Sequence, residues 1–125
     1  DMMFHFVFDS RNTSTHIAYR KTRYFRKQAD VYQLVPQIQK QVHFFYLNLN
    51  ETVYPSLATN TNALDLILCR NVAIYYSEAV IGRVAERFHR CLISGGWLMM
   101  GASETSIPVF HQYTPCNFLG ATVFQ

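Results

Sequence analysis

The chain has 125 residues, of which 50% are hydrophobic, 15% aromatic and 15% charged, and its formal net charge is +3. This composition excludes a disordered chain and is sufficient for one domain with a hydrophobic core. No apolar run reaches the roughly 18 residues of a membrane-spanning helix, and the first residues lack the pattern of a secretory leader. We therefore expect a cytoplasmic protein without membrane insertion.

The basic residues are unevenly distributed, because five of the eleven cluster at Arg20, Lys21, Arg23, Arg26 and Lys27. Such a cluster, interleaved with aromatic residues, could bind phosphate and stack on bases. A solvated face of a helix from Ile17 to about Lys27 explains the same pattern. We adopt the helix and expect no nucleic-acid partner.

A hairpin is predicted in "YFRKQADVYQL", where two aromatic and β-branched runs flank Gln28 to Asp30, although the turn lacks glycine. Pro36 ends this unit. The run "VHFFYLNL", Val42 to Leu49, is too apolar for a strand with one solvated face, so we predict a strand covered on both faces. Residues 50–62, rich in Asn and Thr, are predicted as a loop.

The second half of the chain predicts a strand, a helix and another strand. Leu64 to Cys69 is a continuous apolar strand, Ser77 is suited to cap a helix, and Gly95-Gly96 would end that helix. "GWLMMGAS" is a third buried strand, and this order is typical of a parallel α/β unit. The segments "VFHQY" and "GATVFQ" would close the sheet as an antiparallel hairpin.

Polar residues follow the predicted strands. In parallel α/β sheets ligands bind at the carboxyl ends of strands, where Arg70, Asn71 and the pair Ser103-Glu104 would lie. These residues are therefore candidates for the rim of a site. The alternative is that Arg70 pairs with Asp65 or Glu104 while Asn71 caps a turn, and the pattern leaves both interpretations open.

The three cysteines, Cys69, Cys91 and Cys116, are odd in number and set among apolar neighbours, which indicates reduced thiols rather than a disulfide framework. We interpret Cys69 as a buried thiol and not as a nucleophile. The histidines show no metal-ligand spacing with cysteines or acidic residues, so we assign no metal site.

Three stretches together resemble the CheR family of S-adenosylmethionine-dependent chemotaxis receptor methyltransferases: "VHFFYLNLNETVYP", "LDLILCRNVAIYY" and "LISGGWLMMGASET". The resemblance covers roughly Tyr24 to Gln125. It implies an enzyme that transfers the methyl group of S-adenosylmethionine to receptor glutamates, leaving S-adenosylhomocysteine. It also implies an α/β fold, a Rossmann-like class I methyltransferase sheet with a small antiparallel β-subdomain.

The resemblance implies a partial domain. Residues 1–125 would be a single truncated methyltransferase domain, with the β-subdomain at about 20–40 and the C-terminal part of the sheet at 42–125. The family's glycine-rich cofactor turn is absent, so we expect the first two strands to be missing and catalysis to belong to the full-length enzyme. Exposed sheet edges would then favour self-association or a new strand pairing.

The resemblance also assigns residues. Asn48 and Leu49 would line the adenine side of the cofactor pocket, Arg70 and Asn71 would lie beside the cofactor, and Tyr75 would lie near the methyl-bearing sulfur. Tyr75 and Arg70 are the catalytic candidates, expected to position groups rather than exchange protons, because a glutamate carboxylate is already ionised at neutral pH. Without the resemblance, Tyr75 would be interpreted as a core aromatic residue.

The expected partners are the cytoplasmic helices of chemotaxis receptors, or a receptor tail peptide that adds to a sheet edge of the β-subdomain. Ala102 stands where many family members have histidine, which affects the substrate side of the pocket. The alternative function is a non-catalytic docking module of methyltransferase descent, in which the β-subdomain and the basic segment bind a partner.

Overall fold

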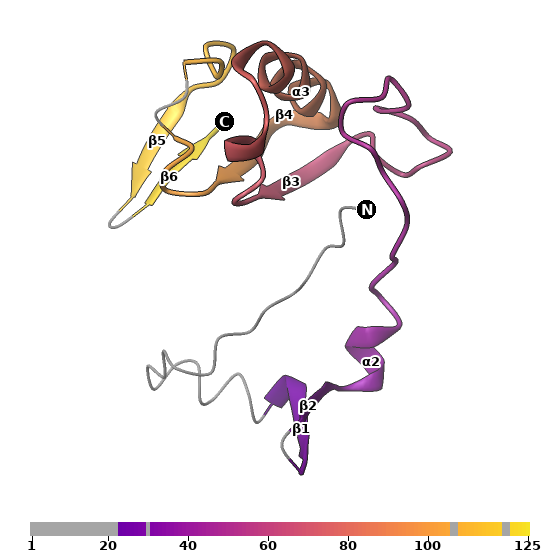
Figure 1. Cartoon of the computed structure of the whole chain (residues 1–125). Coiled ribbons are helices and arrows are strands. Elements are labelled where there is room, and N and C mark those ends of the chain that lie inside the picture. The colour runs from indigo at the N-terminus through magenta and orange to yellow at the C-terminus, as the bar shows by residue number, and fades with distance from the viewer. Residues whose placement is uncertain (1–22, 30, 106–107, 119–120) are drawn as a thin grey trace. The chain divides into compact units, whose positions relative to one another are not determined.

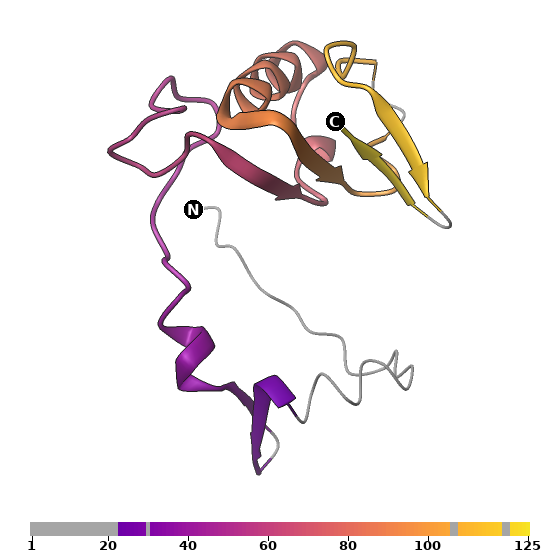
Figure 2. The same ribbon diagram turned by 180° about the vertical axis from the view of Figure 1, so that it is seen from behind.

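The computed structural model describes residues 23–29, 31–105, 108–118 and 121–125, shown as coloured ribbon in Figures 1 and 2. The chain divides into two compact units, residues 1–46 and residues 47–125. Among the described residues, no helix is both long and apolar enough to cross a membrane.

The described part of the first unit contains the predicted hairpin. β1 (Phe25–Gln28) pairs antiparallel with β2 (Val31–Leu34). Ala29, in the turn, has φ +52°, so an alanine takes the left-handed conformation that glycine usually supplies. A short helix, α2 (Pro36–Gln39), follows. The predicted helix from Ile17 to Lys27 is wrong at its end, because β1 pairing takes residues 25–27, while residues 17–22 lie outside the described ones.

The predicted strand from Val42 to Leu49 is also wrong. Residues 42–48 have irregular backbone, and the side chains of Val42, Phe44 and Tyr46 are exposed by 38%, 78% and 77%. A strand is stable only when a neighbour satisfies its backbone N–H and C=O groups. No described strand pairs with this segment. Its high β-propensity alone is therefore not sufficient to form a strand.

The second unit is a mixed four-stranded sheet with one long helix against it. The strand order is β3-β4-β6-β5, in which β3 and β4 are parallel and the other pairs are antiparallel. Figures 1 and 2 show α3 lying over one face of the sheet. The elements are β3 (Leu64–Cys69), the 3-10 turn η1 (Ala73–Tyr75), α3 (Glu78–Cys91), β4 (Leu92–Met100), β5 (Pro115–Phe118) and β6 (Ala121–Phe124).

The predicted strand, helix and strand are confirmed by β3, α3 and β4. Ser77 occupies the N-cap position of α3, although its side chain makes no capping hydrogen bond. The helix forms because apolar residues recur at helical spacing and are buried together. They are Ile81, Val84, Ala85, Phe88 and Cys91.

The predicted end of the helix at Gly95-Gly96 is wrong, because α3 ends at Cys91 and Leu92 already begins β4. The two glycines lie inside β4, where the register with β3 shifts. Gly95 has φ +78°, and a Cβ atom on Gly96 would lie only 3.0 Å from the Ile93 carbonyl oxygen. Glycine is therefore required here for a β-bulge.

The C-terminal hairpin is predicted correctly only in its second strand, β6. β6 pairs with β5 and not with the predicted first strand, Val109 to Tyr113. That segment has no strand structure. Val109, Phe110 and Tyr113 are buried instead, and the Tyr113 hydroxyl donates a 2.8 Å hydrogen bond to the carbonyl oxygen of Ala85 in α3. Burial in the core, which was mistaken for strand pairing, explains the apolar residues of this segment.

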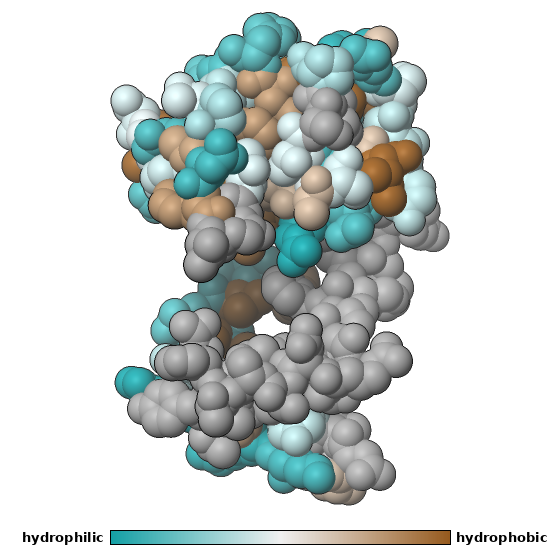
Figure 3. Space-filling model, turned by 90° about the vertical axis from the view of Figure 1, so that its left-hand side faces the viewer, coloured by the Kyte–Doolittle hydropathy of each residue, from teal (hydrophilic) through white to brown (hydrophobic). Residues whose placement is uncertain are grey.

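The other face of the sheet is partly exposed. Leu66 and Leu68 alternate along β3 and are exposed by 47% and 61%, and Phe118 of β5 is exposed by 60%. Figure 3 views the molecule from the β5–β6 side and shows hydrophobic side chains lying between hydrophilic ones. The core therefore lies between α3 and one sheet face.

Candidate functional site

The turn that follows β3 has an unusual backbone. Asn71 has φ +58°, a left-handed conformation that asparagine tolerates better than most residues. Val72 returns to the right-handed region, with φ −117° and ψ −45°. Alternation of this kind turns successive N–H groups toward one point and makes an anion-binding concavity.

The carboxylate of Glu104 occupies that concavity. Its Oε1 accepts hydrogen bonds from the backbone N–H groups of Val72 and Ala73 at 2.9 and 2.7 Å. Its Oε2 accepts from the N–H groups of Asn71 and Gly101 at 2.8 and 2.7 Å. The side chain is fully buried, with 0% exposure. This carboxylate clamp ties the end of β3 to the end of β4.

Glu104 is held in its charged form. Burial raises the pKa of this carboxyl, but the hydrogen bonds from Asn71, Gly101, Ala73 and Val72 together outweigh burial, so the pKa is lowered below its ordinary value of 4.5. Glu104 is therefore a structural anion and not a residue of the rim. The suggested Arg70–Glu104 pair is wrong, because backbone donors satisfy both carboxylate oxygens.

Gly101 is part of the same arrangement. A Cβ atom built on it would overlap Oε2 of Glu104 and lie 3.3 Å from the backbone nitrogen of Asn71. Only glycine leaves room for the buried carboxylate. A glycine three residues before an acid, at the end of a buried strand, is the signal by which the clamp could have been found from sequence.

Three of the residues assigned from the resemblance lie along this turn. Arg70 and Asn71 are exposed, and Tyr75, at the end of η1, is exposed by 78%. Arg70 also lines a recess of about 470 Å³ that extends over the end of β4 to Ala102 and Thr105. The clamp fixes the backbone while leaving these side chains open to a ligand.

Asn48 and Leu49 lie elsewhere. The Asn48 side chain bonds Glu51 at 2.9 Å and the backbone N–H of Asn50 at 3.0 Å. The Leu49 side chain is buried, and its carbonyl oxygen accepts hydrogen bonds from the Tyr54 hydroxyl at 2.7 Å and from Arg87 Nη1 at 2.9 Å.

Arg87 lies near the end of α3, which leads directly into the start of β4. The start of β4 pairs with the start of β3, so the Leu49 carbonyl lies near the amino ends of these strands. Figure 1 shows the loop that precedes β3 at the end of the strand opposite to the arrowhead. The turn at Arg70 is about 20 Å away, the length of a six-residue strand. The structure does not bring the two groups of assigned residues together.

The cysteines offer no chemistry to the site. Cys69, Cys91 and Cys116 are free, as predicted, and the first two are buried in the core, whereas the prediction of a core position is wrong for the partly exposed Cys116. Burial, with a smaller contribution from the Glu104 charge, raises the pKa of Cys69 to about 12. The thiol is therefore protonated at neutral pH and is a poor nucleophile. Among the described residues, no three histidine, cysteine or acidic side chains form a group that could hold a metal ion.

The sequence of residues 5–120 matches the family model described as "CheR methyltransferase, SAM binding domain". The chain belongs to this family. The description names S-adenosylmethionine as the cofactor of the CheR domain, and the resemblance stated from sequence is confirmed.

Curated CheR relatives agree with this assignment. Chemotaxis protein methyltransferase 1 of Pseudomonas aeruginosa is 37% identical over 101 residues, which are 78% of this chain and 35% of the relative. The chemotaxis protein methyltransferase of Borreliella burgdorferi is 35% identical, over 70% of this chain and 30% of the relative. Chemotaxis protein methyltransferase 2 of Vibrio cholerae is 32% identical, over 79% and 34%. The chain thus spans about a third of the length of these relatives.

The side chains on the turn after β3 are chemically compatible with one side of S-adenosylmethionine. Arg70, Asn71 and Tyr75 offer a guanidinium, an amide and a phenol on a fixed turn beside a recess, which suits a polar, charged ligand such as S-adenosylmethionine. Asn48 and Leu49 do not complete the site in this arrangement, because the Asn48 amide bonds within its own loop and Leu49 is buried.

Proposed function

We propose that this chain is part of an S-adenosylmethionine-dependent protein-glutamate O-methyltransferase that acts in the cytoplasm on chemotaxis receptors. The CheR family match and the names of the relatives support the reaction class. The observation that carries the proposal for this chain is the carboxylate clamp, because it holds the turn bearing Arg70 and Tyr75 in one conformation. Preorganisation of this kind is what methyl transfer requires of a protein.

The proposed fold is the C-terminal part of a Rossmann-like class I methyltransferase sheet. In this proposal, residues 1–125 are one truncated domain, residues 42–125 contribute β3, α3 and β4 of the sheet, and the β1–β2 hairpin belongs to the β-subdomain of residues 20–40. The parallel β3–β4 pair joined by α3 supports this placement. The first two strands of the sheet would lie outside this chain.

The proposed roles follow from charge and exposure. When bound, S-adenosylmethionine supplies an electrophilic methyl group on a sulfonium centre. The receptor glutamate is ionised at neutral pH, so no general base is needed. Arg70 would hold an anionic carboxylate, Asn71 would contact the cofactor edge, and Tyr75 would orient the reacting groups and exclude water. In the full-length protein, Asn48 and Leu49 would contact the adenine, which requires their loop to leave its position against Arg87.

Calorimetric titration with S-adenosylhomocysteine tests cofactor binding by the 125-residue chain. Binding should weaken about tenfold in Arg70→Met and severalfold in Asn71→Gly, as expected for lost polar contacts. Asn71→Gly is preferable to Asn71→Ala because glycine retains the left-handed backbone. Arg26→Met removes the same charge from β1 and should leave affinity unchanged. Absence of binding by the folded chain would contradict the cofactor proposal for this chain.

Methyl transfer is tested with the full-length protein. Labelled S-adenosylmethionine and purified receptor cytoplasmic domains should give base-labile methyl esters, and Tyr75→Phe and Arg70→Met should lower kcat. If receptors are not labelled although S-adenosylhomocysteine binds, the receptor substrate is wrong and the cofactor site stands.

A docking module is the second candidate function. Among the described strands β3 pairs with β4 alone, and the β3 face bears the exposed side chains of Leu66 and Leu68. An unpaired apolar edge can accept another strand. We propose that β3 mediates self-association, and that the β1–β2 hairpin can accept a receptor tail peptide in the same manner. Analytical ultracentrifugation of the 125-residue chain should show a concentration-dependent dimer that Leu68→Lys disrupts. A monomer at all concentrations would exclude self-association.

A further inference from the structure

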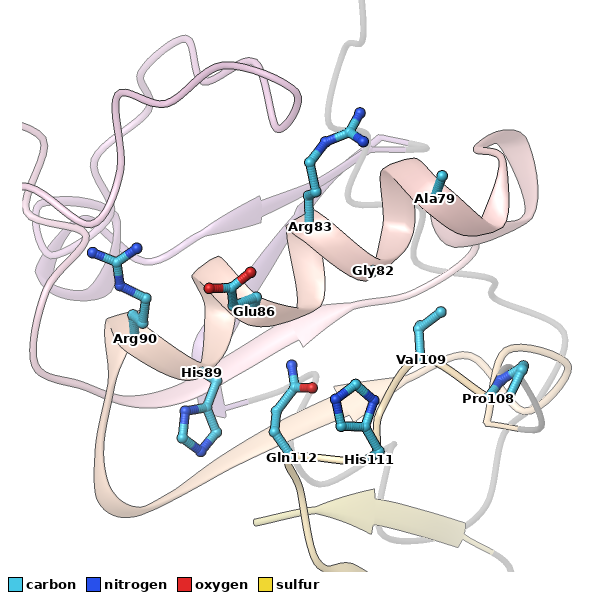
Figure 4. A pocket seen from close by; sticks show the side chains of 10 residues that line it. All are labelled: Ala79, Gly82, Arg83, Glu86, His89, Arg90, Pro108, Val109, His111 and Gln112. Atoms are coloured by element: carbon cyan, nitrogen blue, oxygen red, sulfur yellow. The ribbon is translucent and has the colours of Figure 1, made fainter.

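A second recess lies on the outer side of α3. It has a volume of about 700 Å³ and lies between the exposed face of α3 and the segment 108–112. None of Arg70, Asn71, Tyr75 or Asn48 lines it, so it is separate from the candidate site. Figure 4 shows the helix above and the segment below, with the side chains of His89 and Gln112 between them. The volume lies in the range of ligand pockets in proteins.

Gln112, one of the residues that line this recess, carries a hydrogen-bond donor that lacks an acceptor. Gln112 Nε2 is buried and has no hydrogen-bond partner among the described residues. An unpaired buried donor costs free energy that an incoming acceptor would recover. Figure 4 shows Gln112 beside His89 and His111, whose rings carry further N–H groups. The group that suits this position is a carboxylate or another acceptor-rich group.

The rim of the recess is predominantly positive. Arg83 and Arg90 line it on α3, against the single acid Glu86. Figure 4 shows both guanidinium groups extending from the helix away from the segment 108–112, so they would reach a different part of the ligand from Gln112. A ligand that uses both sets of groups must therefore be extended and carry more than one negative charge.

The length of the recess indicates the size of the ligand. Its residues on α3 run from Ala79 to Arg90, about 16 Å along the helix axis. That length corresponds to about five residues of extended polypeptide. We propose that the recess between α3 and residues 108–112 binds a short acidic peptide segment of a partner protein. One carboxylate would accept from Gln112 Nε2 once the amide, which is buried in the free chain, turns toward the recess, and neighbouring carboxylates would lie near Arg83 and Arg90.

Fluorescence anisotropy with the full 125-residue chain tests this proposal. The probe is a labelled, end-capped peptide of about five alternating glutamates and aspartates, and the matched control peptide has glutamines and asparagines at the same positions. The acidic peptide should bind and the neutral one should not. Equal binding of both peptides would overturn the proposal, as would displacement of the acidic peptide by low millimolar inorganic phosphate, which would indicate a site for simple anions.

Variants separate binding from folding. Gln112→Met removes the donor at similar size, so peptide affinity should fall about tenfold. The thermal midpoint should stay or rise, because an unsatisfied donor has been removed. Glu86→Gln should tighten binding about twofold to fivefold and Arg83→Gln should weaken it. Lys40→Gln removes an exposed positive charge outside the recess and outside the β1–β2 hairpin, and it is the matched charge control. Unchanged affinity in Gln112→Met would overturn the proposed contact.

Discussion

The carboxylate of Glu104 is bound by the backbone N–H of Asn71, 33 residues earlier in the chain, at 2.8 Å. A single acidic side chain thereby sets the conformation of the turn that presents Arg70 and Tyr75. The order of this turn depends on the charge of Glu104 and on the space left by Gly101, and both conditions can be tested.

Glu104→Gln tests the charge. Glutamine retains one acceptor oxygen but turns an NH₂ group toward two backbone N–H groups, which leaves buried donors unpaired. The free energy of unfolding should fall by about 2–3 kcal/mol, measured by urea denaturation. Glu86→Gln, on the exposed face of α3, should change it by less than about 0.5 kcal/mol. Equal effects of the two substitutions would show that the clamp contributes nothing.

The pH dependence of stability follows from the lowered pKa of Glu104. A carboxyl whose pKa is lower in the folded state stabilises the fold above its unfolded pKa, near 4.5, and loses that contribution as the pH falls through the folded value. The difference in thermal midpoint between the native chain and Glu104→Gln should therefore be largest near neutral pH and should shrink below about pH 4. A difference that stays constant down to about pH 2 would contradict this assignment.

Gly101→Ala tests the space beside the carboxylate. The added methyl group would overlap Glu104 Oε2, so we expect a loss of about 1–3 kcal/mol, as for other overpacked sites. Gly82→Ala is the matched control. Its Cβ would lie 3.8 Å from Val109 Cγ1, an ordinary contact, and alanine favours the helix by up to about 1 kcal/mol. The two substitutions should therefore shift the thermal midpoint in opposite directions.

Thiol labelling tests the burial of the cysteines. Cys116 is partly exposed, whereas Cys69 and Cys91 are buried with raised pKa values. With an aromatic disulfide reagent at neutral pH, one thiol should react quickly and the other two only after unfolding in denaturant. Rapid modification of Cys69 in the folded chain would contradict the position of β3 against α3.

Sequence analysis succeeded where structure is determined by neighbouring residues. The spacing from Ile81 to Phe88 and the apolar run of β3 each specify an element almost alone, because helical periodicity and strand hydrophobicity are local properties. The polar end of β3 was likewise recognised as the place of Arg70 and Asn71. The family resemblance rested partly on the stretch that contains β3 and this polar end, and not on the residues of α3.

The clamp was not predicted, because it depends on backbone N–H groups that every residue except proline carries. The sequence carries two weak signals of these donors: Asn71, a residue type that tolerates the left-handed region, and Gly101, three residues before Glu104. The segment Val42 to Leu49 failed for another reason. Strand formation depends on a partner, and no described strand pairs with this segment.

The exposed run from Val42 to Tyr46 affects how the protein behaves at high concentration. It combines one valine, one histidine and three aromatic residues without acidic, Lys or Arg side chains or proline, which is the composition of segments that stack into cross-β fibrils. Its side chains are already accessible in the native fold, so assembly through it would not wait for global unfolding. Solubility could therefore be governed by five residues that contribute little to the core, and a single lysine at Phe44 would be the least invasive way to raise it.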